Sequence, residues 1–189
     1  MTGAPAVRVG VSACLLGQEV RYDGGHKRDP LLTDVIARFV QWVPVCPEEE
    51  AGFGTPREAM RLERRRGEVR LVTVRTRRDV TAQLATAADR RVKQLAKLDL
   101  GGYILKKDSP SCGLSHVNVF GSRGGVSRTG RGLFAATLRR AFPMLPVEDE
   151  DRLRDPRILE RFLVRVFAHA QLAVPKELLS AKASTRRRR

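Results

Sequence analysis

Four short apolar runs alternate with longer segments of helical spacing, and this alternation restricts the fold more than any other feature of the chain. The runs are residues 7–11, 42–45, 69–74 and 103–105. Each run has the length of a β-strand and is too short for a buried helix. Strands that alternate with helices predict an α/β fold with a mainly parallel, Rossmann-like sheet flanked by helices.

Apolar residues recur every three or four positions in five further segments, which predicts helices. These segments are residues 31–40, 57–66, 80–100 and 133–142, and a last stretch that begins at Asp155-Pro156. The last helix is expected to form a C-terminal extension, since an Asp-Pro pair is typical of a helix start. Residues 121–132 are glycine-rich and predict a loop, but they match no phosphate-binding pattern. Binding of a nucleoside triphosphate is therefore not expected.

Composition divides the 189 residues into three parts. Residues 1–146 are long enough for one domain with its own core. Residues 147–175 are predicted to form an acidic linker, at 148–151, followed by the amphipathic helix. Residues 176–189 are basic and are expected to be a disordered tail. No apolar run approaches the ~20 residues of a membrane span, and the N-terminus lacks a signal-peptide pattern, so a cytoplasmic protein is expected.

The chain is strongly basic, with 36 Lys and Arg against 21 Asp and Glu and a net charge of +15. This excess favours a polyanion partner, such as a nucleic acid, or a negatively charged substrate. The alternative interpretation is a genome composition that favours arginine, combined with a solvated basic tail. The four terminal arginines, residues 186–189, contribute to that tail.

Three cysteines, Cys14, Cys46 and Cys112, occupy equivalent places in the predicted fold. Cys14 and Cys46 follow the first two strands, and Cys112 follows the fourth strand after the short turn DSPSCG. Because the carboxyl ends of parallel strands share one edge of a sheet, we expect the three thiols to meet there. Proline, glycine and serine flank the cysteines, which lets backbone N–H groups approach the sulfur atoms.

The cysteines alone leave several interpretations open. An odd number of thiols in a cytoplasmic chain disfavours a disulfide framework. The thiols are then ordinary buried side chains, or one of them is reactive, or they bind zinc with a histidine such as His26 or His116. In a further interpretation they hold an iron–sulfur cluster, and with only three ligands one iron stays open as a Lewis acid.

Three separated segments carry a resemblance to one known family. They are VGVSACLLGQEVRYDGGHK, VPVCPEEEAGFGTPRE and LKKDSPSCG, and the segments DVTAQLATAA and GRGLFAATL follow the same spacing. In this order they resemble the 2-thiouracil desulfidase-like family. The resemblance covers about residues 7–146. It implies an enzyme that removes sulfur from a thiolated pyrimidine of the 2-thiouracil or 4-thiouridine type.

The resemblance also implies a cofactor and a catalytic carboxylate. Cys14, Cys46 and Cys112 would hold a [4Fe-4S] cluster whose open iron takes the sulfur of the substrate. Glu48, in Cys-Pro-Glu, would be the acid/base that activates water, so that oxygen replaces sulfur. Some family members have a further cysteine after this motif, whereas this chain has Glu-Glu-Ala-Gly at residues 49–52. No mechanism that needs an additional protein thiol is therefore expected.

Two serines and five further residues complete the predicted site. Ser109 and Ser111, beside Cys112, are implied to line the substrate site and to take part in catalysis. The predicted substrate contacts are Ser12, Arg21, Tyr22, Asp23 and Arg57. Two of these predictions have alternatives. The segment RYDGGHK either closes over the substrate or is an exposed turn, and Arg57 holds an anionic group, or Glu48, or neither.

The C-terminal part bears on the substrate. Residues 145–172 resemble a connector that, in two-domain relatives linked to removal of sulfur from 4-thiouridine in tRNA, leads into a second domain. That domain does not follow here, so a small thiolated pyrimidine is expected and thiolated tRNA is the alternative. A metal-containing RNA-binding protein without catalysis is the other alternative, and a homodimer formed through the last helix is considered.

Overall fold

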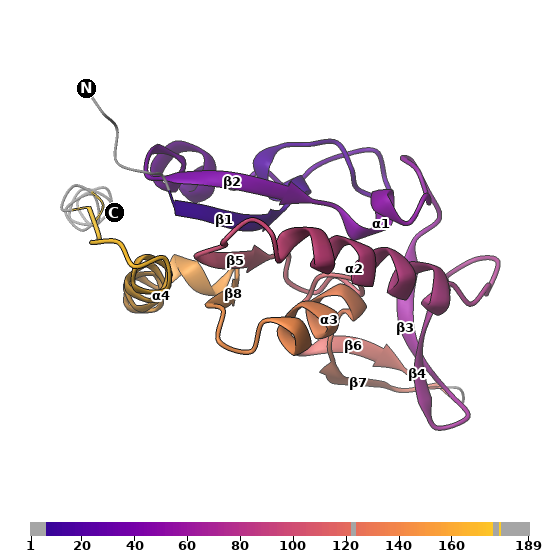
Figure 1. Cartoon of the computed structure of the whole chain (residues 1–189). Coiled ribbons are helices and arrows are strands. Elements are labelled where there is room, and N and C mark those ends of the chain that lie inside the picture. Colours follow the sequence, from indigo (N-terminus) through magenta and orange to yellow (C-terminus); the bar gives the residue numbers. More distant parts are fainter. Residues whose placement is uncertain (1–6, 122–123, 176–177, 179–189) are drawn as a thin grey trace.

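The strands form two separate four-stranded sheets in the computed structural model (Figure 1), which describes residues 7–121, 124–175 and 178. The strands are β1 Val7–Ser12, β2 Val40–Val45, β3 Met60–Arg65, β4 Glu68–Thr73, β5 Gly102–Leu105, β6 Val117–Phe120, β7 Val126–Gly130 and β8 Val147–Asp149. The α-helices are α1 Pro47–Glu50, α2 Thr81–Leu95, α3 Leu133–Ala141 and α4 Pro156–His169. The remaining short helices are η1 Ala13–Leu16, η2 Leu31–Val35, η3 Ile36–Arg38 and η4 Arg152–Arg154.

The first sheet is entirely parallel, with the strand order β2-β1-β5-β8. β1 is central, and Val9 and Val11 are almost completely buried, as a strand with helices on both faces requires. The predicted α/β fold with a parallel sheet flanked by helices is confirmed. The carboxyl ends of β1, β2 and β5 lie at one edge, so the segments that follow these strands are neighbours.

Helices cover both faces of the parallel sheet. On one face, Phe162 and Val166 of α4 join Val9 in one apolar cluster. On the other face, α2 and α3 pack against β5, where Tyr103 is fully buried against Phe134. The Tyr103 ring lies over Gly10 of β1, at a position where any Cβ atom would overlap with the ring. The predicted C-terminal helix is therefore a layer of the domain.

The second sheet is mixed, with the order β4-β3-β6-β7, and it was not predicted. The prediction of a helix at residues 57–66 is wrong, because Met60–Arg65 is strand β3. In β3 the apolar Leu62 lies between the charged Arg61 and Glu63, which is the period of two of a strand. The antiparallel pairing with β4 stabilises β3 as a strand. The predicted strand at 69–74 exists as β4, but it belongs to this second sheet.

Three other segments also differ from their predictions. Residues 31–40 form two short helical turns and the start of β2, and the glycine-rich residues 121–132 contain β7. β8 falls within the predicted acidic linker, and it pairs in parallel with β5. The division of the chain at residue 146 stays a prediction. The predicted tail, residues 176–189, lies outside the described residues except for Leu178, and among the helices that are described none is long and apolar enough to cross a membrane.

Candidate functional site

A cavity of about 420 Å³ opens at the edge of the parallel sheet where β1, β2 and β5 end. Its volume is within the range of ~300–1,000 Å³ that is usual for small-molecule sites. The residues that line it are Ser12, Ala13, Cys14, Val20, Arg21, Tyr22, Val45, Cys46, Pro47, Glu48, Arg57, Ala59, Met60, Lys106, Lys107, Asp108, Ser109, Pro110 and Cys112. Residues distant in the sequence therefore share one site, as the strand-end argument predicts.

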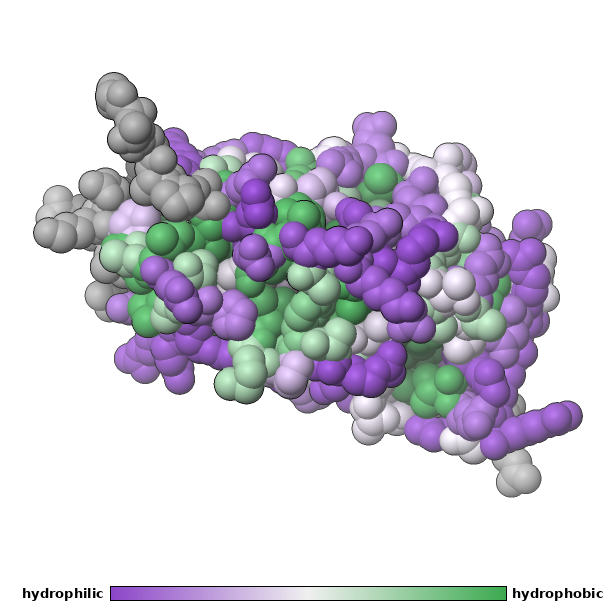
Figure 2. Space-filling view, in the orientation of Figure 1, coloured by the Kyte–Doolittle hydropathy of each residue, from purple (hydrophilic) through white to green (hydrophobic). Residues whose placement is uncertain are grey.

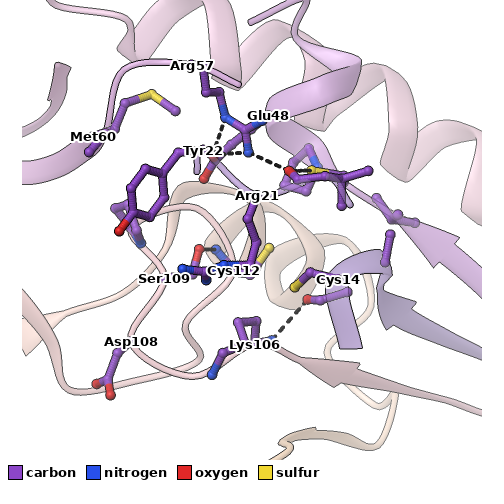
Figure 3. Close-up of a pocket in the computed structure, with 18 of the residues that line it drawn as sticks. Cys14, Arg21, Tyr22, Glu48, Arg57, Met60, Lys106, Asp108, Ser109 and Cys112 are labelled. Carbon is purple, nitrogen blue, oxygen red and sulfur yellow. Dashed lines mark hydrogen bonds and ion pairs between the residues drawn. The ribbon is translucent and has the colours of Figure 1, made fainter. Parts of the chain in front are cut away.

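All three cysteines line this cavity, and all three are free thiols. Cys14 is the second residue of the short helix η1 that follows β1, Cys46 directly follows β2, and Cys112 lies in the turn after β5. Cys14 and Cys112 are buried, and Cys46 is half-buried, with its Sγ 3.6 Å from the carbonyl oxygen of Val20. Figure 3 shows the labelled Cys14 and Cys112 near each other in the cavity.

Burial holds the three thiols in the protonated form. It raises the pKa of Cys14 to about 11, with the neighbouring Cys46 adding to the shift and Lys106 opposing it. Burial likewise raises the pKa of Cys46, and it raises the pKa of Cys112 well above its ordinary value, against a hydrogen bond from Ser12. Because the bound form of a thiol ligand is the thiolate, a positively charged group must enter this cavity to deprotonate the thiols.

Each oxygen of the Glu48 carboxylate has a hydrogen-bond partner of its own. Oε2 accepts from the Arg57 guanidinium, at 2.8 Å from Nε and 2.6 Å from Nη2, and Oε1 accepts from the Ser111 hydroxyl at 2.7 Å. The side chains of Arg57 and Glu48 are 6% and 13% exposed. Because different groups bind its two oxygens, and the contact with arginine is charge-assisted, the direction of this carboxylate is fixed. Ser111 is fully buried behind Glu48 and does not itself line the cavity.

Arg57 joins the second cysteine segment to the first. Besides Glu48, its guanidinium donates to the carbonyl oxygens of Val20 at 2.8 Å and Gly54 at 2.7 Å, and it pairs with Glu49 at 3.0 Å. Its backbone N–H donates to the carbonyl of Tyr22 at 2.9 Å. Of the interpretations of Arg57 offered above, the geometry agrees with the contact to Glu48. These contacts use most of its donors, which leaves little capacity for an anionic substrate.

The turn with Cys112 is built by Ser109 and the start of α3. The Ser109 hydroxyl oxygen accepts from the N–H groups of Ser111 at 3.2 Å and Cys112 at 3.0 Å, and it lines the cavity. The N–H of Phe134 in the first turn of α3 donates to the Ser111 carbonyl at 2.9 Å. A Cβ atom on Gly132 would overlap with the Ser111 backbone and lie 2.7 Å from the nitrogen of Cys112. The glycine before α3 thus permits this close approach.

The RYDGGHK segment contributes two lining residues. Arg21 extends into the cavity in Figure 3 and lies 5.2 Å from the centre of the Tyr22 ring, which is 44% exposed at the rim. Asp23 is not a lining residue. It binds the Arg21 guanidinium at 3.0 and 3.2 Å, so it orients Arg21 from outside. Ser12 is buried, and its Oγ accepts from the backbone N–H of Lys106 at 3.0 Å.

Lys106 is a lining residue that the sequence analysis missed. It follows β5 directly, at the same edge as the cysteines, and this position was the signal that could have found it. Its ammonium group is ion-paired with the buried Glu150, whose other oxygen accepts from the N–H of Lys107 at 2.7 Å. Lys106 and Arg21 are the positive charges that lower the pKa of Cys14 against the larger effect of burial.

The donor set fits a group larger than one metal ion. Among the described residues, no three His, Cys, Asp or Glu side chains are arranged around a single ion, and no histidine lines the cavity. The geometry therefore does not favour the zinc interpretation with His26 or His116. Three free thiols that line one cavity are ligands of the kind that hold a [4Fe-4S] cube, in which each thiolate binds a different iron atom. Cys14, Cys46 and Cys112 would be those ligands.

Comparison with known proteins identifies the family of this chain. The family described as 2-thiouracil desulfurase matches residues 9–150. The uncharacterized protein YbbK of Bacillus subtilis (strain 168) is 33% identical over 137 residues, which is 69% of this chain and 89% of that protein. The solved structure of the [4Fe-4S]-dependent thiouracil desulfidase TudS is similar with a TM-score of 0.64 and 35% identity, over 82% of this chain and 97% of TudS.

The chain belongs to the 2-thiouracil desulfurase family. The family resemblance drawn from the three sequence segments is thereby confirmed. The roles of individual residues stay predictions.

Proposed function

We propose that this protein is a [4Fe-4S]-dependent desulfidase that replaces the thiocarbonyl sulfur of a small thiolated pyrimidine with oxygen. The main observation behind the proposal is that three thiols and the Glu48 carboxylate line a single cavity. Arg57 and Ser111 each form a hydrogen bond with that carboxylate. Three thiolate ligands leave one iron of a cube without a protein ligand. When bound, the cluster supplies an open iron that accepts sulfur and acts as a Lewis acid.

Glu48 is the group that this chain offers for moving a proton. Its carboxylate faces the cavity, and its orientation is fixed by Arg57 and Ser111. We assign to Glu48 the removal of a proton from the water that attacks the C–S carbon. In balance, one water adds, the C–S bond breaks, and hydrosulfide leaves while a carbonyl oxygen remains on the ring. General base catalysis of this kind contributes ~10²–10⁴-fold to a rate.

Polar groups around the cavity are placed to orient a pyrimidine ring. Ser109 accepts two backbone hydrogen bonds, so its hydroxyl can donate to a ring carbonyl or nitrogen. Arg21 supplies positive charge near Cys14, and the Tyr22 ring stands at the rim with a face on which a base can stack. Met60, drawn near Tyr22 in Figure 3, adds an apolar surface to the lining.

Anaerobic reconstitution tests the proposal. The protein is loaded with iron and sulfide, and the iron content, visible absorbance and loss of the 2-thiouracil thiocarbonyl absorbance are measured. We expect four iron atoms per chain and stoichiometric release of sulfide during turnover. In Cys112→Ala the cluster should be lost or unstable, and in Glu48→Gln the cluster should form with little turnover.

A matched control variant distinguishes loss of activity through loss of the cluster from loss of activity through loss of the catalytic base. Glu49→Gln removes the adjacent carboxylate, which contacts Arg57 but does not line the cavity. It should retain the cluster and most of the activity. A Cys112→Ala variant with a full, stable cluster would refute the ligand assignment, and undiminished turnover by Glu48→Gln would refute its role as the base.

A further inference from the structure

The hairpin of β3 and β4, with the turn that follows it, carries a high concentration of positive charge. Residues 61–78 contain eight arginines, two glutamates and no lysine. Guanidinium groups are planar, bind phosphate through two parallel hydrogen bonds and stack on bases, whereas an ammonium group does neither. The hairpin therefore has the composition of a surface that contacts a polyanion with flat bases.

A buried carboxylate holds three of these arginines in place. The Glu63 side chain is only 4% exposed and forms ion pairs with Arg61 at 3.0 Å, Arg65 at 3.0 Å and Arg77 at 2.7 Å. The three arginine side chains are 29%, 33% and 45% exposed. One negative charge therefore fixes three positive charges that still reach solvent. Fixed side chains lose less conformational entropy when a ligand binds.

An aromatic ring lies within this group of arginines. The Arg61 guanidinium carbon is 4.6 Å from the centre of the Phe120 ring on β6. Phe120 is half-buried and pairs with Val126 of β7, which is 54% exposed. We call the sheet surface of Arg61, Glu63 and Phe120, with Arg65 and Arg77, the arginine face. Single-stranded nucleic acid is commonly bound by such a combination of positive charge and stacking surfaces.

Further arginines of the hairpin add charge that no nearby acid neutralises. Arg64, Arg66 and Arg78 are exposed, and none of them forms an ion pair with any residue in the ranges that the structure describes. Figure 2 shows hydrophilic side chains gathered over the end of the molecule where β3 and β4 lie. Most other cations near the cavity opening have acidic partners, such as Arg21 with Asp23 and Lys107 with Asp151.

The hairpin begins at the rim of the cavity. Ala59 and Met60, where β3 starts, are lining residues, and Asp108 on the rim pairs with Arg128 of β7 at 3.3 Å. A polyanion on the mixed sheet would therefore run past the opening. Uracil is a base of RNA, so the polyanion that suits a site for thiolated uracil is RNA.

We propose that the arginine face and the hairpin arginines bind the phosphate backbone of RNA and bring a thiolated uridine to the cavity. The argument for RNA binding depends on the positive charge and the stacking surface described above. The argument that a base is delivered to the cavity depends on the proposed function. The surface contacts phosphates and stacks bases without reading their order. Binding should therefore depend steeply on salt and only weakly on sequence.

A comparison of two charge variants of the full chain tests the docking surface. The first is Arg64→Gln/Arg66→Gln/Arg78→Gln on the hairpin. The second, the matched control, is Arg157→Gln/Arg161→Gln/Arg165→Gln on the exposed side of α4, which lies at the opposite end of the molecule in Figure 1. Binding of a labelled single-stranded RNA is measured over a range of salt concentrations, and a DNA of the same sequence is measured alongside.

The hairpin variant should bind RNA at least ~10-fold more weakly, and the slope of log affinity against log salt should fall by about 2, which is ~0.7 for each lost phosphate contact. The α4 variant should stay within ~2-fold of the unmodified protein, as expected when a charge lies more than a Debye length from the ligand. Equal losses in both variants, or no loss in either, would overturn the proposal. Binding of the DNA should weaken in the hairpin variant in parallel with binding of the RNA, because both polymers share the phosphates and base faces that the surface contacts. DNA binding that the hairpin variant leaves unchanged would also overturn the proposal.

Turnover separates this inference from the proposed function. The hairpin variant, loaded with its cluster, should desulfurise free 2-thiouracil at the normal rate and lose kcat/KM only on RNA that contains thiouridine. Equal kcat/KM on that RNA for both variants would refute delivery of the base. A third outcome is that no protein, modified or not, releases sulfide from any substrate, while RNA binding still depends on the hairpin. That outcome would refute the desulfidase function and the delivery of the base, and it would support the docking surface.

Discussion

The Ser111 hydroxyl donates a 2.7 Å hydrogen bond to Glu48 Oε1, and this contact connects the turn that contains Cys112 to the segment that follows Cys46. The two residues are 63 positions apart in the sequence. Ser111 is fully buried, so its hydroxyl has no solvent to replace the carboxylate as a partner. If Glu48 has the proposed role, we expect Ser111 to be a positioning residue that acts through it.

Ser111→Ala should therefore lower kcat more than it lowers cluster content. A hydrogen bond to a charged group contributes ~1.5–3 kcal/mol, so loss of this contact should reduce kcat by about 10- to 100-fold. The measurement is 2-thiouracil turnover by samples of equal iron content. Ser127→Ala, on the exposed β7, is the matched control and should behave as the unmodified protein. Normal turnover by Ser111→Ala at equal iron content would contradict the role.

Gly132→Ala should weaken cluster binding although it leaves all three cysteines unchanged. The added Cβ would overlap with the Ser111 backbone and press on the Cys112 nitrogen, so the turn must shift. Overpacking of this kind typically costs ~1–3 kcal/mol, which a domain of this size tolerates. Iron and sulfide per chain after reconstitution, with circular dichroism to verify folding, give the readout.

Gly25→Ala is the control for that substitution. Its Cβ would meet only the Asp23 carboxylate, at an ordinary contact distance of 3.4 Å. The variant should load normally. Equal cluster content in the two variants would show that the close approach at Gly132 does not shape the Cys112 turn.

The site was predictable from the sequence to the extent that it depends on parallel strand ends. Cys46 and Lys106 follow strands of the same sheet directly, and Cys14 comes two residues after the end of a third strand. Parallel strands bring such positions to one edge. Lys106 was overlooked because its charge resembles that of any surface lysine. The contact between Ser111 and Glu48 was not predictable, since it depends on the turn conformation that α3 imposes on residues 109–113.

The mixed sheet escaped prediction for a different reason. In β3, Met60 and Leu62 alternate with Arg61 and Glu63, and two further arginines follow, but arginine and glutamate also suit an exposed helix. Only the pairing with β4 and β6 decides in favour of a strand, and that pairing joins segments 57 positions apart, such as Leu62 and Val119. Non-local pairing of this kind leaves no periodic signal in a short window.

The thiols of the cluster-free protein should react slowly at neutral pH. Burial raises the pKa of Cys14 to about 11, so about one molecule in ten thousand carries the thiolate at pH 7. The rate of alkylation by iodoacetamide, followed by mass spectrometry, should rise about tenfold per pH unit up to pH 10. Glutathione in the same reaction is the reference thiol. Modification of Cys14 as fast as glutathione at pH 7 would contradict the assignment of a buried, protonated thiol.

Asp149→Asn should stabilise the protein at neutral pH and have less effect in acid. Burial raises the pKa of this carboxyl to about 6 in the folded chain, from 3.8, and the backbone N–H of Leu114 opposes the shift. Between pH 4 and 6 the folded state therefore binds more protons than the unfolded state, and stability falls as the pH rises through that window. An amide carries no charge to bury, yet it still accepts from Leu114.

The rise in the pKa of Asp149, from 3.8 to about 6, determines how much stability the variant should gain. The variant should gain up to about 3 kcal/mol of unfolding free energy at pH 7.5, and the gain should shrink toward zero at pH 4. The unfolding free energies of both proteins are measured by urea denaturation across this pH range. Subtracting one from the other removes the contribution of all other titrating groups. Asp89→Asn, exposed on α2, is the matched control and should show no such trend. A gain that is constant with pH, or that grows toward acid, would contradict a raised pKa at Asp149.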